Sequence, residues 1–416
     1  MPRAPFPVAL LGSIPPDIDA VVMRDGHRTV IGVDPVEIVA ADGAAALEAL
    51  DHLTPGWWAG FFSYDLGRAI ERVVSSTASH AEASAPTPDL MLARFDARLV
   101  VDPVSAQAWI EGDGTGRAHL ESALRRATDM EPLGVHAPPQ LGPWSSSFTR
   151  EEFEVAVRTV IDLIGEGDCY QTNLTRRLVC ERSADPVELF AALVTQNPAP
   201  HEALVRFGDV SIVSASPERF LRRDGNRIET RPMKGTGTDA AGLLSSPKDR
   251  AENVMIVDLS RNDLGRVCEF GSIEVPDLFA VEAHPGLYQM VSTVSGVLRP
   301  DVSLGELVGA TFPPASVTGA PKPRVLQVIE DLEPVRRGVY CGAVGWIDTE
   351  RNAADLNVAI RTFTIAGGIT SLGVGSGIVD DSDTGAEWEE TQHKAARLLA
   401  AAGTGIPKDA RVGIAS

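Results

Sequence analysis

The stretch LNVAIRTFTIAGGITSLGVGSG, residues 356–377, decides the fold class of this chain. Its β-branched and apolar residues favour strands, and its glycines mark places where strands can turn or end. Tight turns such as Asp224-Gly225-Asn226 join other runs of this kind and favour antiparallel pairing. Further strand-like runs are found at residues 177–183, 203–216, 220–230 and 339–348. The sequence therefore predicts a mixed α+β protein built on large antiparallel sheets.

Helices are expected to cover these sheets. The clearest begins after Thr149, which can cap it together with Glu152 three residues later, and it ends at Gly165 and Gly167. Other helices are predicted at residues 43–52, 185–196, 247–260, 303–310, 322–332 and 385–402. Segment 51–71 is aromatic and glycine-rich, and we interpret it as a core hairpin that packs two layers together.

The organisation along the chain predicts intimately packed parts rather than separate modules. Residues 76–89 are small, polar and proline-bearing and are interpreted as a mobile loop, whereas residues 133–153 are typical of a linker. The predicted divisions are an N-terminal region at 1–140, a catalytic region at 141–405 and a tail at 406–416.

The charge balance limits the classes of partner. The chain has 416 residues, a formal net charge of −20 and a sequence pI of about 4.8. This balance disfavours nucleic acid, because phosphate backbones need compensating cations. An anionic small substrate is compatible with it only where local cations or a metal offset the overall field.

Cysteine usage and hydropathy favour a cytoplasmic protein. The four cysteines lie far apart without a CxxC pair, which argues against structural zinc and against a disulfide framework. The first residues, MPRAPFPVALLGSIPPDI, lack a signal-peptide pattern, and no segment approaches the apolar length of a membrane span. We therefore expect a reduced, cytoplasmic setting without membrane contact.

Three charged residues share one face of the helix predicted at 385–402. Glu387, Glu390 and Lys394 are spaced i, i+3 and i+7, and two carboxylates with an ammonium can ligate Mg²⁺ and bind an anion. On spacing alone, a solvated salt-bridge face is the better interpretation. Glu252 is open to the same choice, as a metal ligand or as a solvated acid near the start of its helix.

Three other features suit an anion or a reacting substrate. Lys234 precedes a Gly-Thr step, so it is either a solvated loop lysine or a nucleophile or anion clamp. Arg361 is placed within an apolar strand, where an arginine is unusual unless paired, and its guanidinium suits a planar anion. The glycine-dense strand exit at 371–383 could cradle a carboxylate with backbone N–H groups, although a turn is the simpler interpretation.

Eight segments follow one another in a characteristic order. They are SASPERF (214–220), RPMKGT (231–236), ENVMIVDLSRNDLGRV (252–267), SVTGAPKPR (316–324), VYCGAVGW (339–346), NVAIRTF (357–363), GVGSGIV (373–379) and GAEWEETQHKAARL (385–398). Together they resemble the chorismate-utilising enzymes, which include anthranilate, aminodeoxychorismate, isochorismate and salicylate synthases. The resemblance covers most of the chain from about residue 148 to residue 402. It implies two large antiparallel sheets that face each other, helices packed outside, and an active site in the cleft.

The resemblance implies chorismate as the substrate and Mg²⁺ as the cofactor. Glu252 and Glu390 resemble residues that bind Mg²⁺, which holds the ring carboxylate of chorismate, and Glu387 lies on the same side. Lys394 resembles a further carboxylate contact.

The same resemblance gives roles to residues elsewhere in the cleft. Arg361 and Tyr340 resemble the residues that grip the enolpyruvyl carboxylate. The backbone at Gly375, Ser376 and Gly377 resembles the loop that supports this contact.

One carboxylate is assigned to catalysis by the resemblance. Glu218 looks like the acid that helps the C4 hydroxyl of chorismate to leave. The alternative for Glu218 is a structural salt bridge to Arg219 or Arg222.

Two positions distinguish the reactions within the family. Where members that add water carry a general-base lysine, this chain has Gln171, which has no useful pKa near neutrality and is interpreted as a substrate contact. Where anthranilate synthases carry an alanine, this chain has Lys234, as aminodeoxychorismate synthases do, with Gly235 and Thr236 as further substrate contacts. Lys234 is then expected to attack C2 while the C4 hydroxyl leaves, after which ammonia adds at C4 and expels the lysine. Gln289 departs from the family pattern, because many relatives have a substrate-contacting histidine there.

The expected product is 4-amino-4-deoxychorismate, in the 4-aminobenzoate and folate branch. No cysteine sits in the glycine elbow of a glutaminase, so ammonia is expected from a separate glutamine amidotransferase subunit. Two alternatives stay open. One is anthranilate synthase component I, and the other is a noncatalytic protein of the same fold that only binds a partner.

Overall fold

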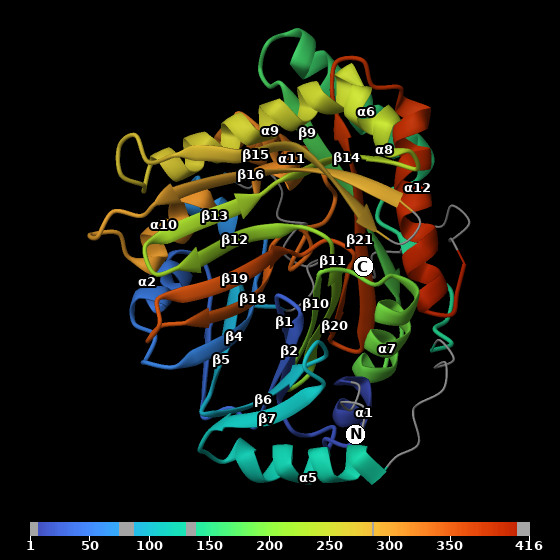
Figure 1. The fold of residues 1–416 in the computed structure, drawn as a ribbon. Coiled ribbons are helices and arrows are strands. Elements are labelled where there is room, and N and C mark those ends of the chain that lie inside the picture. Colours follow the sequence, from blue (N-terminus) through green and yellow to red (C-terminus); the bar gives the residue numbers. More distant parts are fainter. Residues whose placement is uncertain (1–6, 75–86, 130–138, 285–286, 406–416) are drawn as a thin grey trace.

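The computed structural model describes residues 7–74, 87–129, 139–284 and 287–405, which form two antiparallel sheets flanked by helices (Figure 1). This confirms the predicted α+β class with large antiparallel sheets. Among these residues, no helix combines the length and the apolar character needed to cross a membrane. The tail at 406–416 and parts of the segments interpreted as loop and linker, at 75–86 and 130–138, lie outside the described residues.

The first sheet has eleven strands in the order β17-β9-β21-β20-β11-β10-β1-β2-β6-β7, with β8 beside β9. Its strands are β1 (Ala20–Asp25), β2 (Arg28–Val33), β6 (Ala97–Asp102), β7 (Gln107–Gly112), β8 (Ser145–Ser146), β9 (Gln171–Cys180), β10 (His201–Phe207), β11 (Val210–Ser216), β17 (Gly319–Ala320), β20 (Thr362–Ala366) and β21 (Ile369–Ile378). The long pairing of β9 with β21 runs from Cys180 opposite Thr370 to Thr172 opposite Ile378. It forms one wall of the region described below.

The second sheet has ten strands in the order β14-β16-β13-β12-β19-β18-β4-β5-β3, with β15 beside β16. Its strands are β3 (Glu37–Ala41), β4 (Trp57–Phe62), β5 (Leu90–Phe95), β12 (Arg219–Asp224), β13 (Arg227–Arg231), β14 (Met233–Gly237), β15 (Glu274–His284), β16 (Leu287–Val297), β18 (Ala343–Asp348) and β19 (Ala353–Val358). Both β13 and β14 pair with β16, and Pro232 lies between them. Proline lacks a backbone N–H, so it interrupts the strand just before Lys234.

The helices agree closely with the sequence pattern. They are α1 (Pro7–Gly12), α2 (Ala44–Asp51), α3 (Leu66–Ile70), α5 (Gly116–Asp129), α6 (Arg150–Gly165), α7 (Pro186–Gln196), α8 (Ala240–Ser245), α9 (Pro247–Gly265), α10 (Leu304–Thr311), α11 (Lys322–Leu332), α12 (Thr384–Ala401) and the 3₁₀ turn η1 (Ala315–Val317). The capping box of Thr149 and Glu152 is formed. All seven predicted helices are present, and α9 continues to Gly265, beyond its predicted end. Helices α1, α3, α5 and α8 were not predicted.

Three layers of apolar contact hold the sheets and helices together. Residues such as Val21, Phe61 and Phe95 fill the space between the two sheets. Helices α1, α5, α7 and α12 pack on the outer side of the first sheet, whereas α2, α9, α10 and α11 pack on the outer side of the second (Figure 1). Helix α6 packs against β9, α11 and α12 in a smaller cluster. Strands from residues 20–112 belong to both sheets, so the N-terminal region shares its cores with the rest of the chain.

The aromatic segment 51–71 corrects one prediction. It contains a single strand, β4, followed by the short helix α3, and not a hairpin. Strand β4 lies between β18 and β5, so its partners come from distant parts of the sequence. Its side chains alternate between faces, with Trp57 and Phe61 in the core between the sheets and Trp58 and Phe62 in the outer core. The segment therefore joins two layers, as expected, but it does so as a single strand and not as a hairpin.

Two of the points at which the chain passes between the two sheets lie next to each other. Strand β11 of the first sheet leads through Pro217 and Glu218 to β12 of the second, and β19 of the second leads through residues 359–361 to β20 of the first. The Val358 N–H donates to the Glu218 carbonyl at 3.0 Å, which ties the two passages together. Arg361 therefore lies between strands and not within one, contrary to the sequence-based prediction. Both Glu218 and Arg361 face the region where the sheets exchange strands.

Candidate active site

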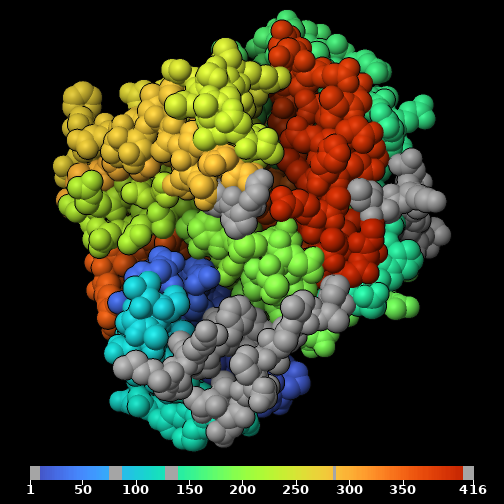
Figure 2. Space-filling model, turned by 45° about the vertical axis from the view of Figure 1, so that its right-hand side comes forward, coloured from blue at the N-terminus to red at the C-terminus, as the bar shows by residue number. Residues whose placement is uncertain are grey.

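A cavity of about 1020 Å³ lies beside these passages, between the two sheets and α12. The predicted site residues on its wall are Glu218, Lys234, Gly235, Thr236, Glu252, Tyr340, Arg361, Gly375, Gly377, Glu387, Glu390 and Lys394. Figure 2 shows α12, in red, beside the yellow-green segment that contains α8 and the start of α9. An ion pair connects α9 to the segment that precedes α12, with Lys248 Nζ 3.0 Å from Asp381 Oδ1. Residues spread over more than 170 positions of sequence thus meet at one cavity.

Lys234 projects into this cavity from β14. Its side chain is 16% exposed, and its Nζ lies 3.8 Å from Glu252 Oε2. Burial, assisted by the nearby Lys394 ammonium, lowers the pKa of Lys234, although Glu252, Glu218 and Glu390 act against this shift. The interpretation as a solvated loop lysine is therefore wrong. An amine with a lowered pKa is neutral more often and is a better nucleophile.

The backbone after Lys234 makes room for the neighbouring acid helix. Gly235 has φ +87°, in the region that favours glycine, and an added Cβ would lie 3.0 Å from Asp249 Oδ1. Because no side chain intervenes, β14 lies close against the first turns of α9, which carry Asp249 and Glu252.

Glu218 is buried, with 4% of its surface exposed. Burial raises its pKa from 4.5 to about 7, and this rise is limited by a hydrogen bond from Ser316, by Lys234 and by the backbone N–H of Met233. A carboxyl with such a pKa is protonated often enough near neutrality to act as an acid. The alternative role in a salt bridge to Arg219 is not seen, because Arg219 pairs with Asp355 at 3.0 Å and with Glu229 at 3.1 Å.

The carboxylates of α9 and α12 meet at the acidic end of the cavity. Burial raises the pKa of Glu252, whereas burial is outweighed at Glu390 by Lys394 and by hydrogen bonds from Lys394 and Ser376, which lower its pKa. Glu390 Oε1 lies 2.6 Å from Lys394 Nζ. Glu387 accepts a hydrogen bond from the Ser376 hydroxyl. Ser376 is thus placed beside Glu387 and Glu390 of α12, although it is not on the cavity wall.

The acidic end has the donor chemistry of a Mg²⁺ site without being a complete cage. In the part of the chain that the structure describes, no three His, Cys, Asp or Glu side chains are gathered as a ready-made metal site. Mg²⁺ is commonly held by one or two carboxylates together with water and substrate oxygens, so Glu252 and Glu390 suffice as protein ligands. Their hard oxygen donors, on helices that face each other across the cavity, fit this ion.

The other end of the cavity is basic. Arg361 has φ 52°, a conformation that non-glycine residues rarely adopt and that concentrates at functional sites. Burial and the nearby Arg397 lower the pKa of Arg361. Lys394, which pairs with Glu390 of the acidic end, also donates from its Nζ to the Gly375 carbonyl at 2.9 Å. Tyr340 lines the cavity as well. Guanidinium and hydroxyl groups on a cavity wall suit a carboxylate.

Like Ser376, Gln171 is a predicted substrate contact that does not lie on the cavity wall. It is fully buried on β9, and neither its Nε2 nor its Oε1 has a hydrogen-bond partner among the described residues. A Cβ added at Gly377 would lie 2.9 Å from Gln171 Nε2 and 3.1 Å from Lys234 Nζ. The glutamine amide and the lysine amine therefore flank the same glycine, which must lack a side chain.

Some residues at the site were not predicted from the sequence. Ser316, Arg397 and Asn173 line the cavity, and Ser316 bonds to Glu218 across almost a hundred positions of sequence. Ser316 and Arg397 do fall inside the characteristic segments, but no charge pattern or spacing marks them. Gln289, noted as a departure, lines the cavity with its buried Oε1 unpartnered among the described residues.

Comparisons with known proteins show which family this chain is similar to. The chorismate binding enzyme family matches residues 21–400. Aminodeoxychorismate synthase component 1 of Escherichia coli is 37% identical over 92% of this chain and 85% of its own length. An anthranilate synthase component 1 of Haloarcula marismortui is 39% identical over 82% of this chain and 74% of its own length.

Solved structures agree with the fold. The crystal structure of anthranilate synthase component I from Streptococcus pneumoniae superposes with a TM-score of 0.75, at 27% identity, over 89% of this chain and 92% of that chain. The menaquinone-specific isochorismate synthase of Escherichia coli gives a TM-score of 0.74 at 17% identity, over 95% and 91% of the two chains, which is evidence for the fold alone. The matched family spans both sheets and the whole cavity wall, so this chain belongs to the chorismate binding enzymes.

Proposed function

We propose that this chain aminates chorismate at C4, giving 4-amino-4-deoxychorismate, through a covalent adduct on Lys234. The observation that carries the proposal is the position of Lys234. Its amine is buried at the cavity wall, its pKa is lowered by burial, and its Nζ lies 3.8 Å from Glu252 Oε2. A side chain that only clamped a carboxylate would gain nothing from a lowered pKa, whereas a nucleophile must be neutral.

The proposed reaction balances without any group beyond chorismate and ammonia. Lys234 Nζ forms a bond to C2, the ring double bond shifts, and the C4–O bond breaks as Glu218 gives its proton to the departing oxygen, which leaves as water. Ammonia then forms a bond to C4, the double bond shifts back, and Lys234 leaves C2 as a neutral amine. The proton lost by the incoming nitrogen returns to Glu218, so both residues end as they began.

The two ends of the cavity match the two carboxylates of chorismate. Mg²⁺, bound by Glu252 and Glu390 with Glu387 beside them, would offset the negative charge of the ring carboxylate. Arg361 and Tyr340 would bind the enolpyruvyl carboxylate at the basic end.

Ammonia is proposed to come from a separate glutamine amidotransferase subunit in the cytoplasm. Relatives of both kinds are named as component 1 of their synthases, which supports a second component. The product would then serve 4-aminobenzoate formation in the folate branch.

Anthranilate synthase component I is the second candidate. The observation that favours it is the similarity itself, because a relative of that name is 39% identical, against 37% for the aminodeoxychorismate synthase. Anthranilate formation places nitrogen at C2 and releases pyruvate, so the products of the two reactions differ in mass. A noncatalytic binding protein is the third candidate, and a cavity lined by the acid, the amine and the carboxylates argues against it.

One experiment separates the three candidates. The purified chain is incubated with chorismate, Mg²⁺ and an ammonium salt at alkaline pH, and the products are analysed by mass spectrometry. We expect a product in which the hydroxyl of chorismate is replaced by an amino group and the enolpyruvyl arm is retained. Anthranilate with free pyruvate would instead establish the second candidate, and unchanged chorismate that still binds would establish the third.

A further inference from the structure

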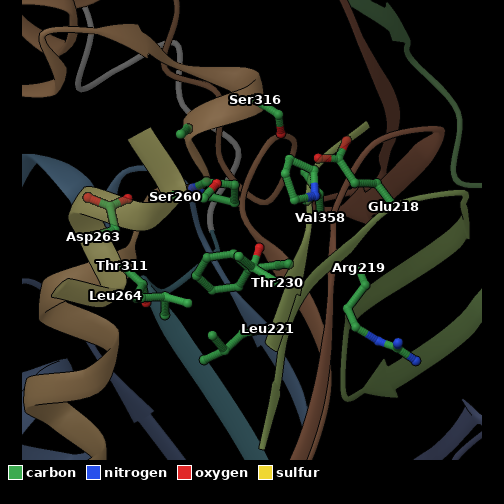
Figure 3. Close-up of a pocket in the computed structure, with 14 residues that line it drawn as sticks. Glu218, Arg219, Leu221, Thr230, Ser260, Asp263, Leu264, Thr311, Ser316 and Val358 are labelled. Atoms are coloured by element: carbon green, nitrogen blue, oxygen red, sulfur yellow. The ribbon is translucent and has the colours of Figure 1, made fainter. Parts of the chain in front are cut away.

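A second, much smaller cavity lies behind Glu218. It measures about 20 Å³, which is room for a single water molecule. Glu218 and Ser316 line both this cavity and the large one, so they form the wall between the two. Figure 3 shows these two residues on one side of the small cavity, Ser260 and Asp263 of α9 on the opposite side, and the Thr230 hydroxyl between them.

The polar lining distinguishes this cavity from a simple packing defect. Apolar voids in proteins stay dry, whereas a buried water needs two to four polar partners. The residues that border this space include four with hydroxyl groups and two with carboxyl groups, namely Thr230, Ser260, Thr311, Ser316, Glu218 and Asp263. A water placed here would find partners on every polar side of the cavity.

A buried ion pair closes the far side of the cavity. Asp263 Oδ2 lies 2.7 Å from Lys322 Nζ, which also donates to the Thr311 carbonyl at 3.0 Å. The side chains of Lys322 and Asp263 are only 8% and 12% exposed. The proposed reaction uses neither residue, and a buried pair of this kind contributes little net stability by itself. Because it lies behind Glu218, the proposed acid, the Asp263–Lys322 pair is a candidate for a functional role.

We propose that an ordered water molecule occupies the small cavity and connects Glu218 to the Asp263–Lys322 pair, so that Thr230, Ser260 and Asp263 position the acid. The role of the water in catalysis rests on the proposed function of Glu218, but the water site itself does not.

A water molecule in the small cavity would stabilise the ionised form of Glu218. When Glu218 gives its proton to the departing oxygen, a carboxylate is left in a buried environment, which is costly unless hydrogen bonds reach it. The Ser316 hydroxyl and the Met233 N–H are near enough to lower the pKa of Glu218 through hydrogen bonding. A water held by Thr230, Ser260 and Asp263 supplies a further hydrogen bond, from the side that substrate cannot reach. The proton returns to Glu218 from the incoming nitrogen, so the water only donates a hydrogen bond and is not consumed.

The water site is tested first by crystallography at high resolution. We expect one well-ordered water within hydrogen-bond distance of Glu218 and Thr230 in the unliganded protein. In Thr230→Val, which keeps the size of the side chain but removes its hydroxyl, and in Ser260→Val, which fills the space, that water should be lost. An empty cavity in the unmodified protein would overturn the proposal. This result is independent of which reaction the chain catalyses.

Steady-state kinetics then test the positioning role. Loss of one hydrogen bond to a charged group should lower kcat about tenfold in Thr230→Val and Ser260→Val. KM for chorismate should change little, because neither residue lines the large cavity. The matched control is Thr293→Val, since Thr293 is buried on β16 and lines neither cavity. Unchanged kcat in a folded variant that has lost the water would refute the positioning role. A similar fall in kcat in the control would also refute it.

Discussion

At the scale of single residues, the proposed reaction depends on the role of Lys234, because its amine is either a nucleophile or a clamp for a carboxylate. The two roles make opposite demands on its protonation. A clamp works best as a permanent cation, whereas a nucleophile must lose its proton. The buried position of Lys234 on β14, facing Glu218, supports the second role.

Lys234→Arg tests this distinction directly. Arginine also binds carboxylates but stays protonated, so it cannot form the adduct. We expect formation of 4-amino-4-deoxychorismate at saturating chorismate to fall by a factor on the order of 10³ or more, as for loss of other covalent nucleophiles. Lys248→Arg is the matched control, because Lys248 pairs with Asp381 at the cavity rim and arginine can keep that pair. Product formation by Lys234→Arg close to that of the unmodified protein would return Lys234 to the clamp role.

The raised pKa of Glu218 should make the free energy of unfolding depend on pH. Burial raises its pKa from 4.5 to about 7, so the folded chain keeps this proton where the unfolded chain has lost it. The stabilisation of the folded chain by this proton is fully present below pH 4.5 and is lost as the pH rises to about 7. Above that pH the buried carboxylate costs about 3 kcal/mol.

Glu218→Gln removes this cost while removing the acid. We expect the variant to be more stable than the unmodified protein by up to about 3 kcal/mol near pH 8, with the difference shrinking toward about pH 4. Its activity should fall by a factor of about 10² or more. Denaturant unfolding at the two pH values measures the difference. An equal effect at both pH values would contradict the raised pKa.

At the scale of single elements, the sequence predicted most of the helices and strands, and the resemblance named most of the residues that meet at the cavity. Helices with clear caps, such as α6 after Thr149, follow from local pattern because their signals lie within a few residues. Strand β4 was misread because its partners, β5 and β18, are distant in sequence. The contact of Ser316 with Glu218 could not be predicted for the same reason. Local pattern likewise placed Arg361 in a strand, although the chain changes sheets there.

Strand β21 carries a glycine whose replacement should affect activity more than folding. In Gly377→Ala the new methyl group would lie 2.9 Å from Gln171 Nε2 and 3.1 Å from Lys234 Nζ. Both are the ends of flexible side chains, so the fold can adapt while the amine is displaced. A displacement of about 1 Å can cost a hundredfold in rate, and we expect kcat to fall by that order.

The control for this variant is Gly165→Ala, because a Cβ at Gly165 meets nothing within 4 Å. Thermal unfolding of both variants checks that the fold is kept. Normal kcat in Gly377→Ala would show that the amine is not held by this contact.

Helices α9 and α12 supply the carboxylates of the proposed metal site, one from each helix. Glu252→Gln and Glu390→Gln each remove a charged oxygen ligand from an ion that uses few protein ligands. We expect either change, or chelation by EDTA, to lower activity beyond the roughly 10- to 100-fold that is typical of residues supporting metal ligands. Glu389→Gln is the control on the same helix, because Glu389 pairs with Arg150 at 2.9 Å. Full activity in EDTA would rule out a required metal.

At the scale of the whole molecule, the cavity lies where the two sheets exchange strands. The passages through Glu218 and Arg361 bring the acid and the basic end together, while β14 and β21 face each other across the same space. The net charge of −20 hides this local separation into an acidic and a basic end. Composition alone disfavours nucleic acid, whereas only the three-dimensional arrangement shows that cationic and anionic side chains meet at one cavity.

The choice of nitrogen source also belongs to the scale of the whole chain. The state of its four cysteines indicates that glutamine cannot be used directly. Hydrolysis of glutamine needs a reactive thiolate. All four cysteines are buried and free, and burial raises the pKa of Cys268 to about 11 and of Cys341 to about 12. Burial also raises the pKa of Cys169. The thiols of Cys169, Cys268 and Cys341 therefore stay protonated at neutral pH, and all four cysteines are buried away from a substrate.

We therefore expect the purified single chain to form the C4-aminated product with ammonium salts but not with glutamine. The rate with ammonium should rise with pH on the alkaline side, because ammonia and not ammonium attacks C4. The measurement is mass analysis of parallel reactions with each nitrogen source, repeated after alkylation of exposed thiols. Alkylation should leave the ammonium-dependent rate unchanged, since the cysteines are buried. Glutamine-dependent product formation that alkylation abolishes would reveal a glutaminase thiol in this chain and remove the need for a second subunit.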